Sequence, residues 1–497
     1  MGHLFVAQGD LTRLACDAIV VPCDSRLNVN TAWQPILPRG LPVGDRGDWI
    51  RLDGTEDARG VVSQPDSGGR LVRAFVAVHF ETTPRDIVER LWKALVVVAE
   101  RLAPAHGRVE PLIGIPLVGT GYGGLEGRRG EVIEQLLTRH RRESLRADLA
   151  LILLERRDFA AVQVQRNPTT DWAQLDESLQ GIADDLGHLA GEKQLSLFLG
   201  SGVSRPAGLP DWEQLLEGLA RDVPMKFPSG DGLEEAASEI KLRLGDRYPF
   251  ELRKRLSSHQ HAVGHALLAG LRVDQMVTTN FDLCTELALE PLLGGDFRVL
   301  ARQAANGGMP WLLKLNGDIV HPESLTLTSE EFENHKVESE ALRGVVQSLM
   351  LTSHLLFVGF SFRDKSFLEL AAAVNRVREA SSGAGSPIGT ALALTEKEAD
   401  SIHIPGMVLL PMSKERPDEA ARTLEIFLDR LAWAASTNRE RSAEYLLDPR
   451  YWSGLSDADR ELWSLLRTLE LANDEVRSSA GWSRVAACLR ELGSDYH

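Results

Sequence analysis

Short apolar segments alternate with helical patterns along this chain in two successive series, and this alternation restricts the fold more than any other feature. Strands that alternate with helices form parallel sheets. We therefore expect an α/β protein in which the second series builds a doubly wound parallel sheet. The apolar segments are Asp17–Pro22, Leu71–His79, Pro111–Val118, Leu149–Leu154, Leu195–Leu199, Asp274–Thr279, Trp311–Leu315, Leu355–Gly359, Thr390–Leu394 and Met407–Leu410.

The same patterns predict three regions. Residues 1–165 hold the first series, residues 166–435 the second, and residues 436–497 carry helical patterns of their own. Within the first region, Leu37–Gly69 is rich in Gly, Pro and Asp and is predicted to be an elaborate loop. Arg139–Arg142 is predicted to be a solvated helix face.

Composition excludes several classes of function. Acidic residues outnumber basic ones, 71 against 55, for a net charge of −16, which argues against direct binding to nucleic acid or anionic lipid. The four cysteines form no C-x-x-C pair, so neither a disulfide framework nor a metal site is predicted. The apolar runs are too short to span a bilayer, and the N-terminus has no leader pattern. We expect a cytoplasmic protein with no membrane segment.

Four polar motifs follow predicted strands of the second series. They are Gly200-Ser201-Gly202-Val203-Ser204, Thr278-Thr279-Asn280-Phe281-Asp282, Lys314-Leu315-Asn316-Gly317-Asp318 and Gly359-Phe360-Ser361-Phe362-Arg363-Asp364. Open α/β sheets bind ligands at the carboxyl ends of their strands. Glycines in such a loop let the backbone approach a pyrophosphate, and serine hydroxyls can donate hydrogen bonds to it. Any single motif could merely cap a helix or a turn, but four in this order favour a ligand site.

Together the motifs resemble those of the sirtuin superfamily, in particular the NAD-cleaving proteins of bacterial anti-phage defence. The resemblance covers about residues 170–430 and implies a Rossmann-type NAD site. By this resemblance, the phosphates would contact Gly200, Ser201, Gly202 and Ser204. The nicotinamide ribose would lie at Asn280 and Asp282, and the adenosine side at Gly359, Ser361 and Asp364.

Two departures from the family pattern bear on chemistry. The zinc ribbon of paired cysteines is missing, so a zinc-dependent deacetylase is not expected. The family's catalytic histidine falls on Asn316, and an amide cannot act as a base. Hydrolysis could still proceed, because nicotinamide is a neutral leaving group and Asn280 could orient a water. Asp282 or Asp318 could stabilise positive charge, and His321 could replace the base.

The first region resembles a macro domain, a three-layer fold. Gly9–Thr12 and Asp17–Asp24 are similar to the opening of that family, and Pro116–Gly124 to its phosphate loop. The resemblance implies that Asp10 faces adenine and Gly119–Gly124 the diphosphate of ADP-ribose. However, Asp24 stands where a ribose-contacting Asn is expected. ADP-ribose hydrolysis is therefore not expected here, and ligand sensing and a structural role remain open.

We therefore expect an NAD glycohydrolase that takes NAD as substrate, uses no metal, and depletes NAD in anti-phage defence. Asn280, Asp282 and Asn316 are its candidate catalytic residues, and Asp318 joins the NAD-binding residues named above. The alternative is a non-catalytic NAD- or ADP-ribose-binding subunit of a larger complex; deacylation or ADP-ribosyl transfer ranks third. Latency implies control by assembly or by a partner. A homo-oligomer is expected from the Trp-bearing C-terminal segments at Trp452, Trp463 and Trp482, and the resemblance suggests a partner such as a HerA-type ATPase.

Overall fold

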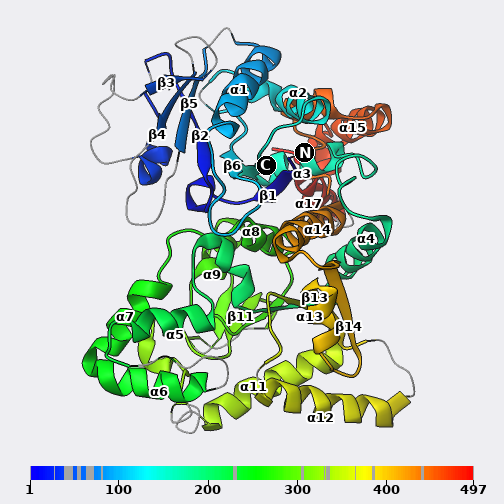
Figure 1. Cartoon of the computed structure of the whole chain (residues 1–497). Coiled ribbons are helices and arrows are strands. Elements are labelled where there is room, and N and C mark those ends of the chain that lie inside the picture. The colour runs from blue at the N-terminus through cyan, green and yellow to red at the C-terminus, as the bar shows by residue number, and fades with distance from the viewer. Residues whose placement is uncertain are drawn as a thin grey trace. The chain divides into compact units, whose positions relative to one another are not determined.

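The chain divides into two compact units (Figure 1). The first comprises Met1–Gly187 and Asp429–His497, and the second comprises His188–Leu428. The computed structural model describes residues 2–26, 28–37, 49–52, 58–62, 72–79, 82–121, 123–225, 227, 232–300, 302–303, 307–328, 331, 336–363, 365–382, 387–437 and 442–495. None of the helices in these ranges is both long enough and apolar enough to cross a bilayer.

A mixed sheet forms the centre of the first unit. Its strand order is β1-β7-β6-β2-β5-β4-β3, in which the first five strands are parallel and the last two run antiparallel to their neighbours. Two of these strands lie inside Leu37–Gly69, so the prediction of a loop there was wrong in part. The strands are β1 (Leu4–Gln8), β2 (Ala18–Cys23), β3 (Trp49–Arg51), β4 (Ala58–Val62), β5 (Val72–Ala77), β6 (Leu112–Ile115) and β7 (Asp148–Leu153).

Helices α1 (Pro84–Ala99) and α2 (Arg129–Arg142) pack against each other beside this sheet (Figure 1). Thr83 and Asp86 form a capping box at the start of α1, and Pro84 occupies its first position, where no backbone donor is needed. The apolar face of α1, which includes Leu91 and Trp92, is buried in the core of the unit. The sequence thus specifies both where α1 begins and which face it buries.

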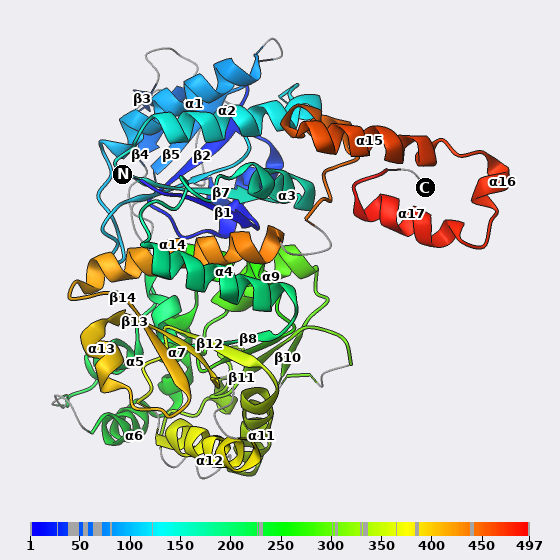
Figure 2. The ribbon, with the colours of Figure 1, turned by 90° about the vertical axis from the view of Figure 1, so that its right-hand side faces the viewer.

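The C-terminal helices group with the first unit. The short helix η8 (Pro449–Gly454) contacts α2, and α15 (Asp457–Glu470), α16 (Asp474–Arg477) and α17 (Trp482–Glu491) follow it (Figure 2). Tyr451 is fully buried, and its hydroxyl donates to Asp158 Oδ1 at 2.8 Å. Arg157 donates to Asp448 at 2.9 Å. These buried polar contacts attach residues 442–495 to a unit that begins more than 400 residues earlier.

The second unit contains the doubly wound parallel sheet expected from the sequence. Its order is β10-β11-β9-β8-β12-β13-β14, and every neighbouring pair is parallel. The strands β9, β10 and β11 all lie on one side of β8, and β12 pairs with β8 on its other side. The sheet's topological switch point therefore lies between β8 and β12. The strands are β8 (Leu195–Leu199), β9 (Gln275–Thr278), β10 (Arg298–Leu300), β11 (Trp311–Lys314), β12 (His354–Val358), β13 (Gly389–Thr395) and β14 (Met407–Ser413).

Helices complete the second unit. The apolar sides of α11 (Lys336–Thr352) and α12 (Lys365–Ser382) pack on one face of the sheet, and the two helices lie side by side (Figures 1 and 2). Between β8 and β9, the helices α5 (Trp212–Ala220), α6 (Leu233–Leu244) and α7 (Tyr248–Leu256) form a cluster with its own apolar core. They are followed by α8 (Val263–Gly270), which contacts α9 (Cys284–Leu293). Two further helices, α4 (Glu177–Gly191) and α14 (Pro417–Thr437), each include residues of both units.

Candidate functional site

The loops that follow β8 and β12 pack backbone against backbone at the switch point. Gly200 N donates to Val358 O at 2.9 Å, and Gly202 N donates to Gly359 O at 3.0 Å. A Cβ on Gly200 would lie 2.3 Å from Gly359 O, and one on Gly202 would lie 2.8 Å from Gly359 Cα. Gly359 itself has a φ of +66°. These three glycines are therefore required by the contact between the two loops, before any ligand is considered.

Asn280 lies at this switch point with its amide orientation fixed by its neighbours. Its Nδ2 donates to Gly200 O at 3.0 Å and to Ser204 Oγ at 3.3 Å. A carbonyl oxygen can only accept, so Nδ2 must face Gly200. The side chain is 7% exposed, and its Oδ1 has no hydrogen-bond partner among the described residues. An N-cap side chain accepts a backbone N–H of its helix through its oxygen, and Asn280 Oδ1 accepts none, so Asn280 does not cap α9.

Ser204 joins Asn280 to two other buried groups. Its hydroxyl donates to Asp282 Oδ2 at 2.9 Å, and His265 Nε2 lies 3.4 Å from Ser204 Oγ itself. Because the single hydroxyl hydrogen goes to Asp282, a bond from His265 requires the hydrogen on Nε2. Ser204 Oγ then accepts from Asn280 and His265 and donates to Asp282. This buried hydroxyl is fully engaged, so the structure brings Ser204 together with Asn280 and Asp282.

His265, on α8, was not singled out by the sequence. It is 2% exposed, and burial lowers its pKa to about 4, with the nearby Asp282 opposing the shift. The imidazole is therefore neutral near pH 7, and its Nδ1 has no hydrogen-bond partner among the described residues. A polar residue inside the apolar run VGHALLAG was the only signal that could have identified it.

Asn316 follows β11 and is open to a ligand. Its backbone oxygen accepts from Thr326 N at 2.9 Å, and its half-buried side chain makes no hydrogen bond to a described residue. The next residue, Gly317, has a φ of +99°, and a Cβ there would lie 2.2 Å from Ser324 O. The turn at Gly317 therefore accepts only glycine, and it presents Asn316 at the end of the strand.

Asp318, by contrast, is engaged within the protein. Its carboxylate accepts from Val320 N at 2.9 Å and forms ion pairs with Lys314 and Arg302. The side chain is 4% exposed. Its charge is therefore neutralised by protein groups rather than presented to a ligand.

The remaining predicted residues lie at the surface of the site or outside the described ranges. Ser201 is half-buried, and Ser361 is exposed on the loop after β12. The following Phe362 is buried at a φ of +55°, a backbone conformation that non-glycine residues seldom adopt. Asp364 lies outside the described residues.

Three buried side chains could in principle hold a cation. Ligand atoms of His265, Asp282 and Cys284 lie within 4.8 Å of one another. The neighbours already account for these groups, since Asp282 accepts from Ser204 Oγ and from Cys284 N. Burial also raises the pKa of the Cys284 thiol, which disfavours the thiolate that binds metals. The cluster therefore fits a hydrogen-bond network better than a metal site.

In the first unit, the predicted phosphate loop follows β6. Gly119 and Gly124 have φ values of +85° and +82°, and a Cβ on Gly123 would lie 2.6 Å from Val78. At Gly121 no atom lies within 4 Å of an added Cβ. Asp10, after β1, caps its own turn by accepting from Thr12 N at 2.9 Å. The carboxyl ends of β1 and β6 share one edge of the sheet, so these loops lie at the same edge.

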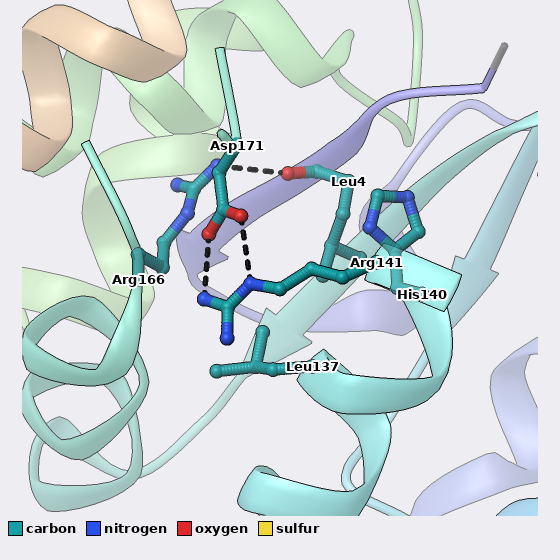
Figure 3. A pocket seen from close by; sticks show the side chains of 6 residues that line it. All are labelled: Leu4, Leu137, His140, Arg141, Arg166 and Asp171. Atoms are coloured by element: carbon teal, nitrogen blue, oxygen red, sulfur yellow. Dashed lines mark hydrogen bonds and ion pairs between the residues drawn. The ribbon is translucent and has the colours of Figure 1, made fainter. Parts of the chain in front are cut away.

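Two hollows lie among the described residues of the first unit. One void of about 10 Å³ has room for a single water and is bordered by Arg141, which pairs with Asp171 at 2.8 Å (Figure 3). This pairing also shows that Arg139–Arg142 is not simply a solvated face. A larger hollow of about 630 Å³ is lined by Ala487 and by acidic and basic side chains in similar number: Glu155, Arg156, Arg157, Glu444, Arg450, Arg490 and Glu491.

Residues 274–403 match the family model of the SIR2-like domain. The chain contains a SIR2-like domain. The matched residues include Asn280, Asp282, Asn316 and Gly359, and the Gly200–Ser204 loop precedes them. The SIR2-like domain therefore accounts for three of the four motifs, and the sheet topology places the remaining motif beside them.

Distant homology links the chain to curated proteins named NAD(+) hydrolase ThsA. It is 25% identical over 200 residues to the protein of Bacillus cereus (strain MSX-D12), covering 38% of this chain and 41% of that protein. It is 25% identical over 183 residues to that of Acinetobacter baumannii (strain 532279), covering 35% and 37%. For Cytobacillus dafuensis the identity is 26% over 210 residues, covering 38% of each chain. The match spans about two fifths of the length of these relatives.

Proposed function

We propose that this protein is an NAD glycohydrolase, which cleaves NAD to ADP-ribose and nicotinamide in its SIR2-like domain. The observation that carries the proposal is the buried group of Asn280, Ser204, Asp282 and His265 at the switch point of a doubly wound sheet. The homology to proteins named NAD(+) hydrolase supports the same reaction.

The reaction requires little of the protein beyond positioning the substrate and a water. The bond between C1′ and nicotinamide nitrogen breaks, nicotinamide leaves as a neutral pyridine, and water forms the new C1′–oxygen bond and releases one proton to the solvent. Asn280 Oδ1, an acceptor without a partner among the described residues, can hold that water or a ribose hydroxyl. Positive charge that develops on the ribose would be stabilised by the Asp282 carboxylate. Asn316, whose side chain is free of described partners, can orient the water but cannot deprotonate it.

Asn316 also favours a second candidate, a non-catalytic subunit that binds NAD or ADP-ribose. An amide in place of a base lowers the capacity for hydrolysis without harming binding. The two candidates differ in one product, because only the glycohydrolase releases nicotinamide.

The biological setting follows from the family resemblance. We infer that the protein depletes NAD in anti-phage defence and that it acts as a homo-oligomer held latent until activation. A partner such as a HerA-type ATPase would provide control. The first unit would serve as a macro-like domain that senses ADP-ribose or has a structural role. Zinc-dependent deacetylation and metal use are not part of the proposal.

The proposal is tested by incubating purified full-length protein with NAD and quantifying nicotinamide and ADP-ribose by chromatography. We expect both products in equal amounts. Protein that binds NAD in calorimetry but releases neither product would instead support the non-catalytic candidate.

A further inference from the structure

Four charged side chains meet near the end of β11. Two of them, Lys314 and Asp318, belong to the third motif. Lys314 Nζ lies 2.9 Å from Glu286 Oε1 and 3.5 Å from Asp318 Oδ1. Arg302 contacts the same two carboxylates, lying 3.1 Å from Glu286 Oε1. Each cation thus touches both anions, and the four charges sum to zero. We call these residues the charge quartet.

Lys314 is the deepest member of the charge quartet. Its side chain is 1% exposed, although lysine is almost never fully buried unless it is paired. It ends β11, where it is in register with Thr278 at the end of β9. The side chain therefore reaches past the end of β9 toward the segment that carries the second motif.

Lys314 also donates to the backbone of that segment. Its Nζ donates to Phe281 O at 3.2 Å and to Asp282 O at 2.5 Å. The Asp282 side chain is held from the other side by Ser204 Oγ and Cys284 N, both at 2.9 Å. Asn280 precedes these residues and depends on the same segment for its place beside Gly200. The ammonium thus anchors the backbone of the segment that carries Asn280 and Asp282.

Charge balance alone does not explain why the Lys314 ammonium donates to two backbone carbonyl groups. Arg302 and Asp318 would neutralise each other without Lys314 and Glu286, and an apolar pair could fill the same volume. The bonds to the carbonyl groups of Phe281 and Asp282 are the contacts that only a donor at position 314 supplies. They act on the conformation of the Asn280–Asp282 segment.

We propose that Lys314 is a positioning residue of the NAD-cleaving site, which holds the Asn280–Asp282 segment so that the Asn280 amide stays beside Gly200 and Ser204. This role rests on the proposed function. Lys314 contacts no reacting atom, and it acts through the backbone of the residues that do.

The test separates positioning from stability by comparing Lys314→Met with the double variant Lys314→Met/Glu286→Gln. The single variant leaves a carboxylate short of a partner and should melt roughly 10 °C lower. The double variant restores the charge balance and should recover most of that loss. In both variants kcat for nicotinamide release should fall on the order of 100-fold, because a displaced catalytic group has that effect. Amide hydrogen exchange in residues 279–286 should become faster in both.

Lys193→Met is the matched control, because Lys193 pairs with Asp274 at 3.2 Å and its side chain is 70% exposed. It should leave kcat and the exchange of residues 279–286 unchanged. Recovery of kcat together with the melting temperature in the double variant would overturn the positioning role, as would a kcat for Lys314→Met close to that of the wild type. Wild-type protein that binds NAD and releases no nicotinamide would refute the proposed function itself, and with it this role.

Discussion

Two hydrogen bonds fix the orientation of the Asn280 side-chain amide. Its Nδ2 is committed to Gly200 O and Ser204 Oγ, so its Oδ1 must face away from them. The sequence predicted a polar side chain at this strand end, and the structure adds which of its two polar atoms remains available. That distinction depends on a residue 80 positions earlier, so no local pattern could have supplied it.

Asn316 provides a test of how much the reaction depends on a base. Its side chain makes no hydrogen bond to a described residue, so Asn316→Ala should leave the melting temperature unchanged and lower nicotinamide release only modestly. Asn316→His introduces an imidazole that can take a proton, and general bases contribute about 10²–10⁴-fold in rate. We therefore expect Asn316→His to be faster than the wild type in the same assay. A collapse of activity in Asn316→Ala would contradict this account.

His265 makes the stability of the protein depend on pH. Burial lowers its pKa from 6.5 to about 4, so between these values the unfolded chain binds a proton that the folded chain does not. The free energy of unfolding should therefore fall as the pH drops from 6.5 toward 4, by up to about 3 kcal/mol. His265→Gln keeps a donor for Ser204 and does not titrate, so its loss of stability with acid should be smaller.

The measurement is denaturant unfolding of both proteins between pH 7.5 and 4.5. His188→Gln is the control, because the His188 side chain is 59% exposed and pairs with Glu192 at the surface. Parallel curves for wild type and His265→Gln would show that His265 is not kept neutral by burial.

At the scale of elements, most of the apolar strands were predicted, although the buried strand β1 was missed, and the short or polar strands were not predicted. The predicted segments 195–199, 311–315 and 407–410 correspond to β8, β11 and β14 within a few residues. The strand β10 has only three residues, and β4 contains Arg59 and Gly60, so neither forms an apolar run. Their strand conformation comes from pairing with neighbours, which a local pattern does not contain.

The loop after β6 tests the macro-like role of the first unit. Gly121 has no atom within 4 Å of an added Cβ, so Gly121→Glu should fold normally. If the loop binds a diphosphate, the new carboxylate would repel it, and calorimetry should show ADP-ribose binding to the wild type and none to the variant. Gly127, equally open, provides the control Gly127→Glu. Equal binding by wild type and Gly121→Glu would remove the loop from the ligand site.

At the scale of the whole molecule, contacts between segments far apart in the sequence decided the division of the chain. The predicted C-terminal region groups with the first unit because Tyr451 and Asp448 bind Asp158 and Arg157. Neither Tyr451 nor Asp448 could be identified from the sequence as a contact residue, because a single tyrosine or aspartate produces no periodic pattern. The sirtuin-like strand ends, by contrast, could be predicted because each motif lies within a few residues of its strand.

Assembly is the prediction that belongs to this scale. A latent NAD-cleaving protein controlled by self-association should form a homo-oligomer whose activity per molecule falls on dilution. Of the three tryptophans that suggested this, Trp452 and Trp463 pack against each other at 4.9 Å, and Trp452 is still 41% exposed. Light scattering should give a mass above that of one chain at micromolar concentration. A monomer with full NAD turnover would contradict the prediction.

The central claim is that Asn280 takes part in cleaving NAD, and nicotinamide release by Asn280→Ala tests it most directly. Wild type and the control Asn375→Ala, a surface change on α12, should release nicotinamide and ADP-ribose in equal amounts and at equal rates. Asn280→Ala should still bind NAD and release nicotinamide at least ~100-fold more slowly, the usual cost of removing one positioned polar group. Release by Asn280→Ala at close to the wild-type rate, or no release by the wild type, would contradict the claim.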